Sequence, residues 1–179
     1  MDLLGGYPFD LDDFDPEADV ITSEVVLPNV GAADRSVARR ASLQILYELD
    51  TTDHEMVDVL AAHMAERPEA YAVRQIIRRI VGGVMANIEG IDAILQQYAP
   101  EWPIDQVAVV DRNILRLAVY EHLLQKRETP IPVLINEAVH LAQLFGADNA
   151  HSFVHGVLGA ITAESKQNFE IAVNEVDKV

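Results

Sequence analysis

The sequence contains no cysteine among its 179 residues. This absence excludes a disulfide framework, a thiolate metal site and a cysteine nucleophile. No apolar run approaches the roughly 20 residues that a membrane helix needs, so we expect no membrane partner. Residues 1–34 lack Lys, Arg and the apolar segment of a signal peptide. We therefore expect a cytoplasmic protein.

Basic residues are few. The 13 Lys and Arg stand against 29 Asp and Glu, which gives a formal net charge of -16. Such a charge by itself argues against nucleic acid as a partner. Its distribution weakens that argument, because residues 1–34 hold nine acidic residues and no Lys or Arg. Prolines and glycines also punctuate this segment, and we predict an acidic, disordered tail over residues 1–34.

From residue 35 onward the apolar residues recur with a helical period, and no segment alternates with period two. A first helix is expected to be followed by a capping box at residues 52–55, with Thr52 as N-cap of the second helix. One long helix is predicted over residues 69–95. Gly82 and Gly83 interrupt it, and such glycines more often permit a close helix crossing than form a phosphate loop.

Pro100 and Pro103 break the chain in the middle, which suggests two helical subdomains that share one core. A fourth helix is expected to stop at Thr129 and Pro130. In the fifth helix, Pro132 suits the first position and Gly146 the C-cap. Asn149 can cap a sixth helix. The sequence thus predicts an all-α domain over residues 35–163 and a short C-terminal tail over residues 164–179.

Two residue pairs could in principle hold a metal, because each shares one helix face: Glu137 with His140, and His151 with His155. A zincin motif needs Glu directly after the first His, and Ser152 stands there. A di-iron bundle needs a second Glu-x-x-His motif, which is missing. The sequence also has no glycine-rich phosphate loop and no nucleophile elbow. We expect no metal, no cofactor and no enzymatic activity.

Arg35, Arg39 and Arg40 stand close together at the start of the first helix. Arg35 and Arg39 are one turn apart, while Arg40 lies about 100° further round. Three guanidiniums at a helix start are electrostatically unfavourable, because the helix dipole favours acids there. Phosphates would offset this by charge-assisted hydrogen bonds. A solvated surface, neutralised by the acidic tail, is the alternative.

Four segments together resemble the NusB family of transcription antitermination factors. They are residues 38–47 (ARRASLQILY), 110–121 (VDRNILRLAVYE), 133–146 (VLINEAVHLAQLFG) and 153–158 (FVHGVL). The similarity runs over about residues 35–163. It implies a fold of two small helical bundles and no catalysis. It also implies binding to boxA-type RNA jointly with NusE, a small-subunit ribosomal protein. The resulting complex helps RNA polymerase to read through terminators, notably on ribosomal RNA operons.

The resemblance also implies site residues. The RNA-binding set comprises Arg35, Arg39, Arg40, Phe145, Gly146, Ala147, Asn149 and Phe153. The set expected to face NusE comprises Tyr47, Tyr98, Asp111 and Arg112. The RNA-binding types fit the chemistry, since aromatic rings stack on unstacked bases and glycine lets the backbone approach.

Several positions depart from the family pattern. Ser36 and Val37 interrupt the arginine run, Asn149 and Ser152 replace a common acid and a common base, and His155 replaces an Asn. RNA affinity could therefore be lower, or depend more on a partner.

Three alternatives stay open. The chain could be a protein-interaction module, for example a homodimer that hides its arginine helix. The RNA-binding domain of an rRNA cytosine methyltransferase is related, but this sequence shows no cofactor-binding sheet. The acidic tail could fold over the arginines as an RNA mimic.

Overall fold

The computed structural model describes residues 31–67, 69–124 and 129–176. Within these ranges the protein has helices and no strand, so the predicted all-α class is confirmed. The elements are α1 (Ala32–Thr51), α2 (Met56–Glu66), α3 (Tyr71–Ala86), α4 (Ile88–Tyr98), α5 (Val109–Val119), a π-helical turn η2 (Tyr120–Leu124), α6 (Ile131–Phe145) and α7 (Ala150–Val176). None of the described helices is long and apolar enough to cross a bilayer.

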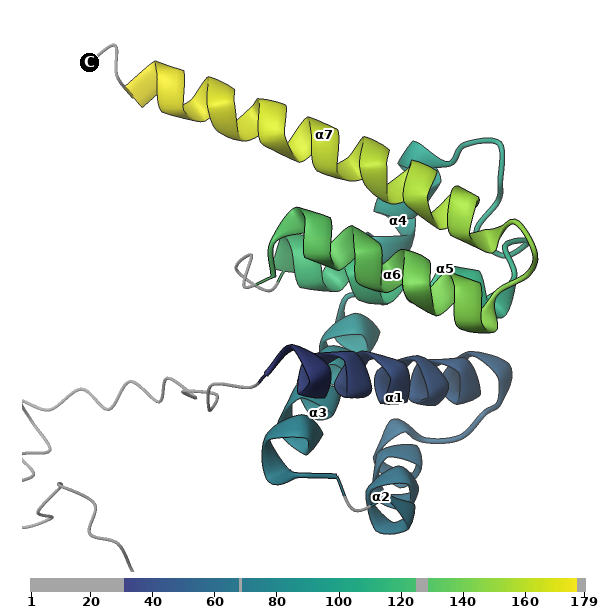
Figure 1. The fold of residues 1–179 in the computed structure, drawn as a ribbon. Coiled ribbons are helices and arrows are strands. Elements are labelled where there is room, and N and C mark those ends of the chain that lie inside the picture. Colours follow the sequence, from purple (N-terminus) through teal and green to yellow (C-terminus); the bar gives the residue numbers. More distant parts are fainter. Residues whose placement is uncertain (1–30, 68, 125–128, 177–179) are drawn as a thin grey trace, which may run out of the picture.

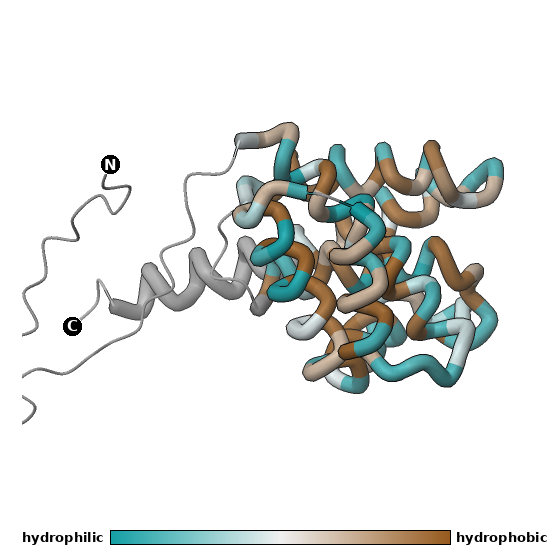
Figure 2. The backbone as a smooth tube through the Cα atoms, turned by 90° about the horizontal axis from the view of Figure 1, so that it is seen from below, coloured by the Kyte–Doolittle hydropathy of each residue, from teal (hydrophilic) through white to brown (hydrophobic). Residues whose placement is uncertain are grey.

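The helices form two groups (Figure 1). The first group is α1–α3 and the second is α4–α7, and α5 contacts helices of both groups. Apolar and polar residues alternate along the helices (Figure 2), as one-sided burial requires. A single cluster of buried residues includes members of all seven α-helices. This confirms the prediction of two bundles that share one core.

The chain passes from one bundle to the other at Asn87, and not at Pro100–Pro103 as the sequence suggested. The long helix predicted over residues 69–95 is broken there into α3 and α4. Asn87 is the C-cap of α3, and its side-chain amide donates a hydrogen bond to the Gly83 carbonyl oxygen (2.8 Å). A short amide side chain competes with the helical ladder in this way, which a periodicity argument does not detect.

The capping box predicted at Thr52 is also wrong. Helix α2 begins at Met56, and its N-cap is Glu55, without a side-chain capping bond. Thr52 instead belongs to the end of α1, where its hydroxyl donates to the Glu48 carbonyl oxygen (2.8 Å) and accepts the His54 backbone N–H (3.3 Å). The Thr hydroxyl thus ends one helix and shapes the connecting turn.

Gly83 permits the close helix crossing that the sequence predicted. A Cβ at Gly83 would collide with the ring of Tyr120, whereas a Cβ at Gly82 would meet no atom within 4 Å. Tyr120 begins the π-helical turn, whose wider winding buries Tyr120, Glu121 and His122 together. This turn directs Glu121 toward α1, which matters for the arginines described next.

Two predicted boundaries differ from the structure. Helix α1 already begins at Ala32, so three residues of the predicted 1–34 tail are helical. Gly31 is the N-cap of this helix, and residues 1–30 of the predicted tail lie outside the described residues. At the other end, the backbone of α7 remains helical through residues 164–176.

Candidate nucleic-acid interface

Arg39 lies inside the protein and not on its surface. Its side chain is 4% exposed, and its guanidinium donates to both Glu121 carboxylate oxygens, from Nε at 2.7 Å and from Nη2 at 3.0 Å. Further bonds reach Glu137 (3.4 Å) and the Thr129 hydroxyl (3.3 Å). Burial lowers the pKa of Arg39, but the bonds to Glu121 and Glu137 outweigh burial and raise it. We therefore assign Arg39 a structural role instead of the predicted phosphate contact.

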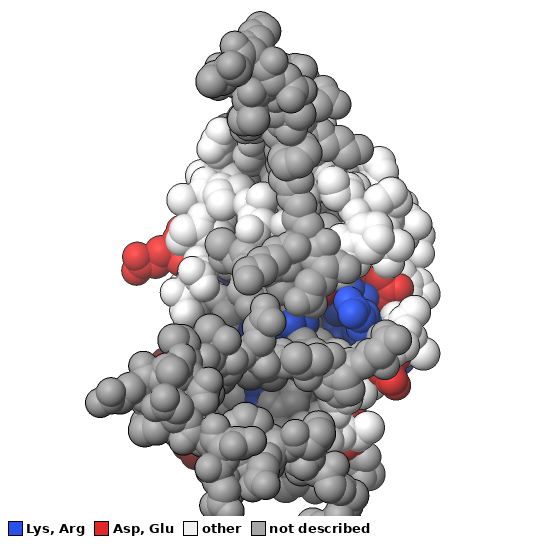
Figure 3. Space-filling view, turned by 90° about the vertical axis from the view of Figure 1, so that its left-hand side faces the viewer, with Lys and Arg blue, Asp and Glu red and all other residues white. Residues whose placement is uncertain are grey.

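Arg35 and Arg40 remain available to a ligand. Arg35 is half-buried and Arg40 is exposed, and neither side chain bonds to another group in the described part of the chain. Arg35 borders a small cavity of about 280 Å³ formed with the start of α6 at Pro130 and Val133. Basic side chains are exposed beside acidic ones on the face of the molecule where α1 begins (Figure 3). Two of the three predicted arginines, Arg35 and Arg40, can thus still contact a phosphate.

The turn between α6 and α7 carries the remaining residues of the predicted RNA-binding set. Helix α6 ends at Phe145, and Gly146 is its C-cap, as predicted. Phe145, Ala147 and Asn149 are exposed, while Phe153 is half-buried in the first turn of α7. The Asn149 carbonyl oxygen accepts the backbone N–H of Phe153 (3.2 Å), so Asn149 stands at the start of α7.

The predicted RNA-binding residues form two groups and not one continuous site. Arg35 borders the first residues of α6, whereas Phe145 is the last residue of that helix. A helix of 15 residues rises about 22 Å at 1.5 Å per residue, so the two groups lie roughly 20 Å apart. An RNA strand that touches both must run along α6.

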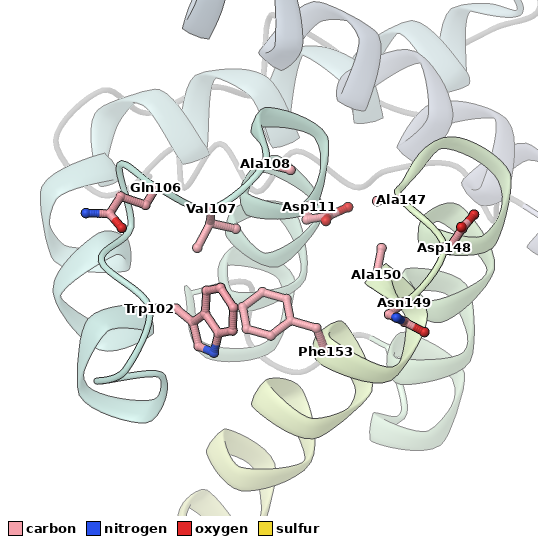
Figure 4. A pocket seen from close by; sticks show the side chains of 10 residues that line it. All are labelled: Trp102, Gln106, Val107, Ala108, Asp111, Ala147, Asp148, Asn149, Ala150 and Phe153. Atoms are coloured by element: carbon pink, nitrogen blue, oxygen red, sulfur yellow. The ribbon is translucent and has the colours of Figure 1, made fainter.

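A cavity opens beside the α6–α7 turn. Its volume is about 580 Å³, and Figure 4 shows the side chains around it. The lining consists of Trp102, Gln106, Val107, Ala108, Asp111, Ala147, Asp148, Asn149, Ala150 and Phe153. Trp102 and Phe153 meet edge to face, with ring centroids 6.2 Å apart. The sequence pattern placed Trp102 in a break between helices but gave no sign of this cavity.

Asp111 is the unusual residue of this cavity. It lies in the first turn of α5 and is 6% exposed, and its Oδ1 atom has no hydrogen-bond partner in the described part of the chain. Burial raises the pKa of its carboxyl group. Gly146 makes the arrangement sterically possible, because a Cβ there would lie 2.7 Å from Asp111 Oδ1. Asp111 therefore combines a negative charge, burial and an unused acceptor.

The residues expected to face NusE lie partly together. Tyr47 is 46% exposed on α1, one turn before Asp50. Asp50 binds Arg112 of α5 (2.7 Å), so Tyr47 and Arg112 lie near the same junction of α1 with α5. Asp111 precedes Arg112 but lines the cavity described above. Tyr98 is half-buried at the end of α4 and packs against the shared core.

Asp50 is at the centre of a second buried network, which the sequence did not reveal. Besides Arg112, it accepts hydrogen bonds from Asn113 (2.8 Å) and from Arg116 (2.9 Å), and Arg116 also binds Asp92 (2.7 Å). Burial raises the pKa of Asp50, but the bonds from Arg112 and Asn113 and the charge of Arg116 outweigh it and lower the pKa. These contacts join α1, α4 and α5.

The residue pairs weighed as metal ligands do not gather into a larger group. Within residues 31–67, 69–124 and 129–176, no three His, Asp or Glu side chains lie close enough to hold a metal ion. Glu137 instead accepts hydrogen bonds from Ser36 (2.6 Å) and Arg39.

Comparisons with known proteins agree with this architecture. A sequence profile of the NusB family matches residues 36–163. The transcription antitermination protein NusB of Chloroflexus aggregans is 41% identical over 144 residues, which cover 78% of this chain and 96% of that protein. NusB of Dehalococcoides mccartyi strain 195 is 37% identical over 128 residues, covering 72% of this chain and 89% of that protein.

Solved structures are similar as well. NusB of T. maritima superposes with a TM-score of 0.69 at 33% identity, covering 76% of this chain and 96% of that chain. A chain of the crystal structure of antitermination factors NusB and NusE in complex with dsRNA gives a TM-score of 0.67 at 27% identity. That match covers 73% of this chain and 97% of the other. Since the profile spans the helical domain and the relatives are matched over most of their length, the chain belongs to the NusB family.

Proposed function

We propose that this protein is a transcription antitermination factor that binds boxA-type RNA together with NusE. In this role it would join the complex that lets RNA polymerase read through terminators, notably on ribosomal RNA operons, in the cytoplasm. The observation that carries the proposal is the family match over residues 36–163. A structurally similar chain comes from a complex of NusB, NusE and dsRNA, which supports both partners. The proposal includes no catalytic step and no cofactor.

The RNA surface that we propose has two anchors. Arg35 and Arg40 at the start of α1 would meet phosphates, and the lack of a partner for either guanidinium among the described residues supports this. At the other end of α6, the α6–α7 turn would meet bases with Phe145, Ala147, Asn149 and Phe153. A glycine at position 146 and nearby aromatic rings suit unstacked bases, which are the usual target of sequence-specific RNA recognition. Arg39 supports this surface from inside.

NusE would bind near the junction of α1 with α5, through Tyr47 and Arg112, with Tyr98 and Asp111 at its margins. Tyr47 offers an exposed aromatic ring, a residue type enriched at protein interfaces. Arg112 is held in place by Asp50. This surface adjoins the cavity beside the α6–α7 turn, so RNA and NusE would bind next to each other.

The test is a titration of labelled boxA-type RNA and a scrambled RNA with the full chain, with and without NusE, across a range of salt. We expect preferential boxA binding that NusE strengthens. The double variant Arg35→Ala with Arg40→Ala should weaken binding at least tenfold and reduce the salt slope by about one to two. Arg78→Ala, which removes an exposed arginine of α3 outside the proposed surface, is the control.

Equal binding of boxA-type and scrambled RNA under every condition would contradict the proposal. Light scattering with and without NusE would then show whether the protein is a homodimer, which is the alternative function as a protein-interaction module. If a 1:1 complex with NusE forms but shows no preference for boxA-type RNA, NusE remains a partner and the RNA-binding part of the proposal is wrong.

A further inference from the structure

We propose that residues 9–19 of this chain bind back over the start of α1 and compete there with RNA. In this contact, acidic side chains of the segment pair with Arg35 and Arg40, and the ring of Phe14 enters the cavity beside Arg35. The contact itself does not depend on the proposed function, whereas its consequence, weaker RNA binding, rests on that function. The protein would thus carry its own competitor for the arginine end of its RNA surface.

The first argument is the place where the preceding chain joins the described structure. Gly31 is the N-cap of α1, and its carbonyl oxygen accepts the backbone N–H of Arg35 (3.1 Å). Thirty residues precede Gly31 in the sequence. The chain between Asp19 and Gly31 spans at most about 40 Å, which is nearly twice the length of α6. Residues 9–19 can therefore reach the whole face on which α1 begins.

The second argument is complementary charge. Residues 1–30 hold eight acidic residues and no Lys, Arg or His, and six of the eight fall within residues 9–19 (FDLDDFDPEAD). At the start of α1, the guanidiniums of Arg35 and Arg40 have no partner among the described residues. Basic side chains are exposed on this face of the molecule (Figure 3). Because a carboxylate can accept the same paired hydrogen bonds from a guanidinium as a phosphate, the segment can replace RNA at these arginines.

The third argument is the cavity of about 280 Å³ beside Arg35, which lies between α1 and Val133 at the start of α6. Val133 is a large apolar side chain that is 46% exposed. An aromatic ring in this cavity would cover Val133 and stack on the Arg35 guanidinium. Phe14 suits this place, because Asp13 and Asp15 flank it and their carboxylates would stay outside beside the arginines.

One acid already lines this cavity, but it does not bind Arg35. Glu137 accepts hydrogen bonds from Ser36 (2.6 Å) and from Arg39 (3.4 Å). In the described part of the chain, no carboxylate is joined to Arg35. The Arg35 guanidinium therefore keeps its donors for an acidic residue of the preceding segment.

A weak contact is sufficient, because the segment and its binding surface belong to one chain. A short linker gives an effective concentration on the order of 1 mM. If the free segment binds with a dissociation constant of about 0.1 mM, the tethered segment covers the arginines about ten times as often as it leaves them free. RNA would then bind about tenfold more weakly than to an uncovered surface.

The direct test needs no RNA. A fluorescein-labelled peptide of residues 7–21 is titrated against the full chain in which the segment is neutralised by Asp→Asn and Glu→Gln substitutions at Asp10, Asp12, Asp13, Asp15, Glu17 and Asp19. We expect saturable binding with a dissociation constant of about 0.1 mM at low salt. The further substitutions Arg35→Ala and Arg40→Ala should weaken it by about fivefold or more, whereas Arg78→Ala should not change it.

A second peptide separates the aromatic contact from the charges. The Phe14→Ala peptide keeps every charge and should also bind about fivefold more weakly, because it lacks the ring that fills the cavity. If the unmodified peptide shows no saturable binding, or if it binds the double arginine variant equally well, the inference is wrong. If the Phe14→Ala peptide binds as tightly as the unmodified one, the cavity does not hold this ring.

The second test measures how tightly boxA-type RNA binds to the full chain as wild type, with the neutralised segment and with Phe14→Ala. At low salt we expect the neutralised protein to bind about tenfold more tightly than wild type and Phe14→Ala about threefold more tightly. These differences should shrink as salt screens the exposed charges. Phe14→Ala is the matched control, because it weakens the contact without changing the net charge of the protein.

The remaining outcomes distinguish this inference from the proposed function. If the peptide binds but neither variant gains RNA affinity, the segment does not compete with RNA, and the proposed function stands. If no form of the protein binds RNA, the competition fails together with the proposed function, while the peptide titration still shows whether the segment binds. If light scattering finds a dimer for wild type and a monomer for the neutralised protein, the segment binds a second copy, and the contact within one chain is wrong.

Discussion

The two ends of α6 hold buried charges in opposite states. Near its start, the Arg39 guanidinium donates hydrogen bonds to Glu121, Glu137 and Thr129. Near its end, Asp111 is also buried, but its Oδ1 atom has no hydrogen-bond partner among the described residues. A buried charge that is paired and hydrogen-bonded holds the fold together, whereas one that lacks a bond costs folding free energy.

The local sequence around these two residues does not reveal what each of them does in the folded protein. Arg39 belongs to an arginine cluster and looked like an RNA ligand, but its partners are 82 and 98 positions away in the chain. Asp111 is one acidic residue among 29 Asp and Glu, and the carboxylate stands out only because of what surrounds it. Substitution of a paired buried charge should therefore destabilise the protein, whereas substitution of the unpaired one should not.

Removing Arg39 should have the largest effect. Arg39→Ala leaves the buried Glu121 carboxylate without its main partner, and we expect the free energy of unfolding to fall by about 3–5 kcal/mol. Urea unfolding followed by circular dichroism measures it. Arg40→Ala, one position along and exposed, should change stability by less than about 0.5 kcal/mol. An Arg39→Ala protein as stable as wild type would contradict the structural role.

Asp50 is a second buried charge whose partners are present. Asp50→Asn removes the ion pairs with Arg112 and Arg116 and should cost about 1.5–3 kcal/mol at neutral pH. Because its pKa is lowered in the folded state, its contribution is complete above the ordinary value of 3.8 and is lost as the pH falls through the folded pKa. Wild type should thus lose stability in acid more steeply than the variant. Parallel pH profiles would refute this.

A substitution at Gly146 tests how closely this glycine packs against the Asp111 carboxylate. In Gly146→Ala the new Cβ would lie 2.7 Å from both the Ala142 carbonyl oxygen and Asp111 Oδ1. We expect a loss of about 1–3 kcal/mol from this overpacking, measured by thermal unfolding. Gly156→Ala is the control, because no atom lies within 4 Å of its Cβ, and it should stabilise α7 by up to about 1 kcal/mol.

Asp111 should give the smallest effect and the opposite sign. Asp111→Asn relieves the burial of a charge and should raise the free energy of unfolding at pH 7 by about 1 kcal/mol. Because burial raises its pKa in the folded state, wild type gains stability relative to the variant as the pH falls through the folded pKa. The two proteins should therefore converge near pH 3.8, where the charge is lost in both states. A variant less stable at pH 7 would mean that Asp111 has a partner.

Much of the fold could be predicted from the sequence. The helical period of apolar residues gave the all-α class, and the resemblance to the NusB family implied the two bundles. Gly146 as a C-cap and Gly83 at a close crossing were also recognisable, because glycine at such positions has a local physical reason. The break at Asn87 and the start of α2 at Met56 were not, since a single side-chain hydrogen bond decides each turn.

For the candidate site, too, some properties follow from the sequence and others only from the tertiary structure. The sequence by itself determined which residues carry cations, rings and flexible backbone, and its motifs determined the family. Only the tertiary structure decided that Arg39 is inside and Arg35 is not, because the π-helical turn directs Glu121 toward α1 from 82 residues away. It alone placed Trp102, Asp111 and Phe153 around one cavity, since burial and an unmade hydrogen bond depend on neighbours that are remote along the chain.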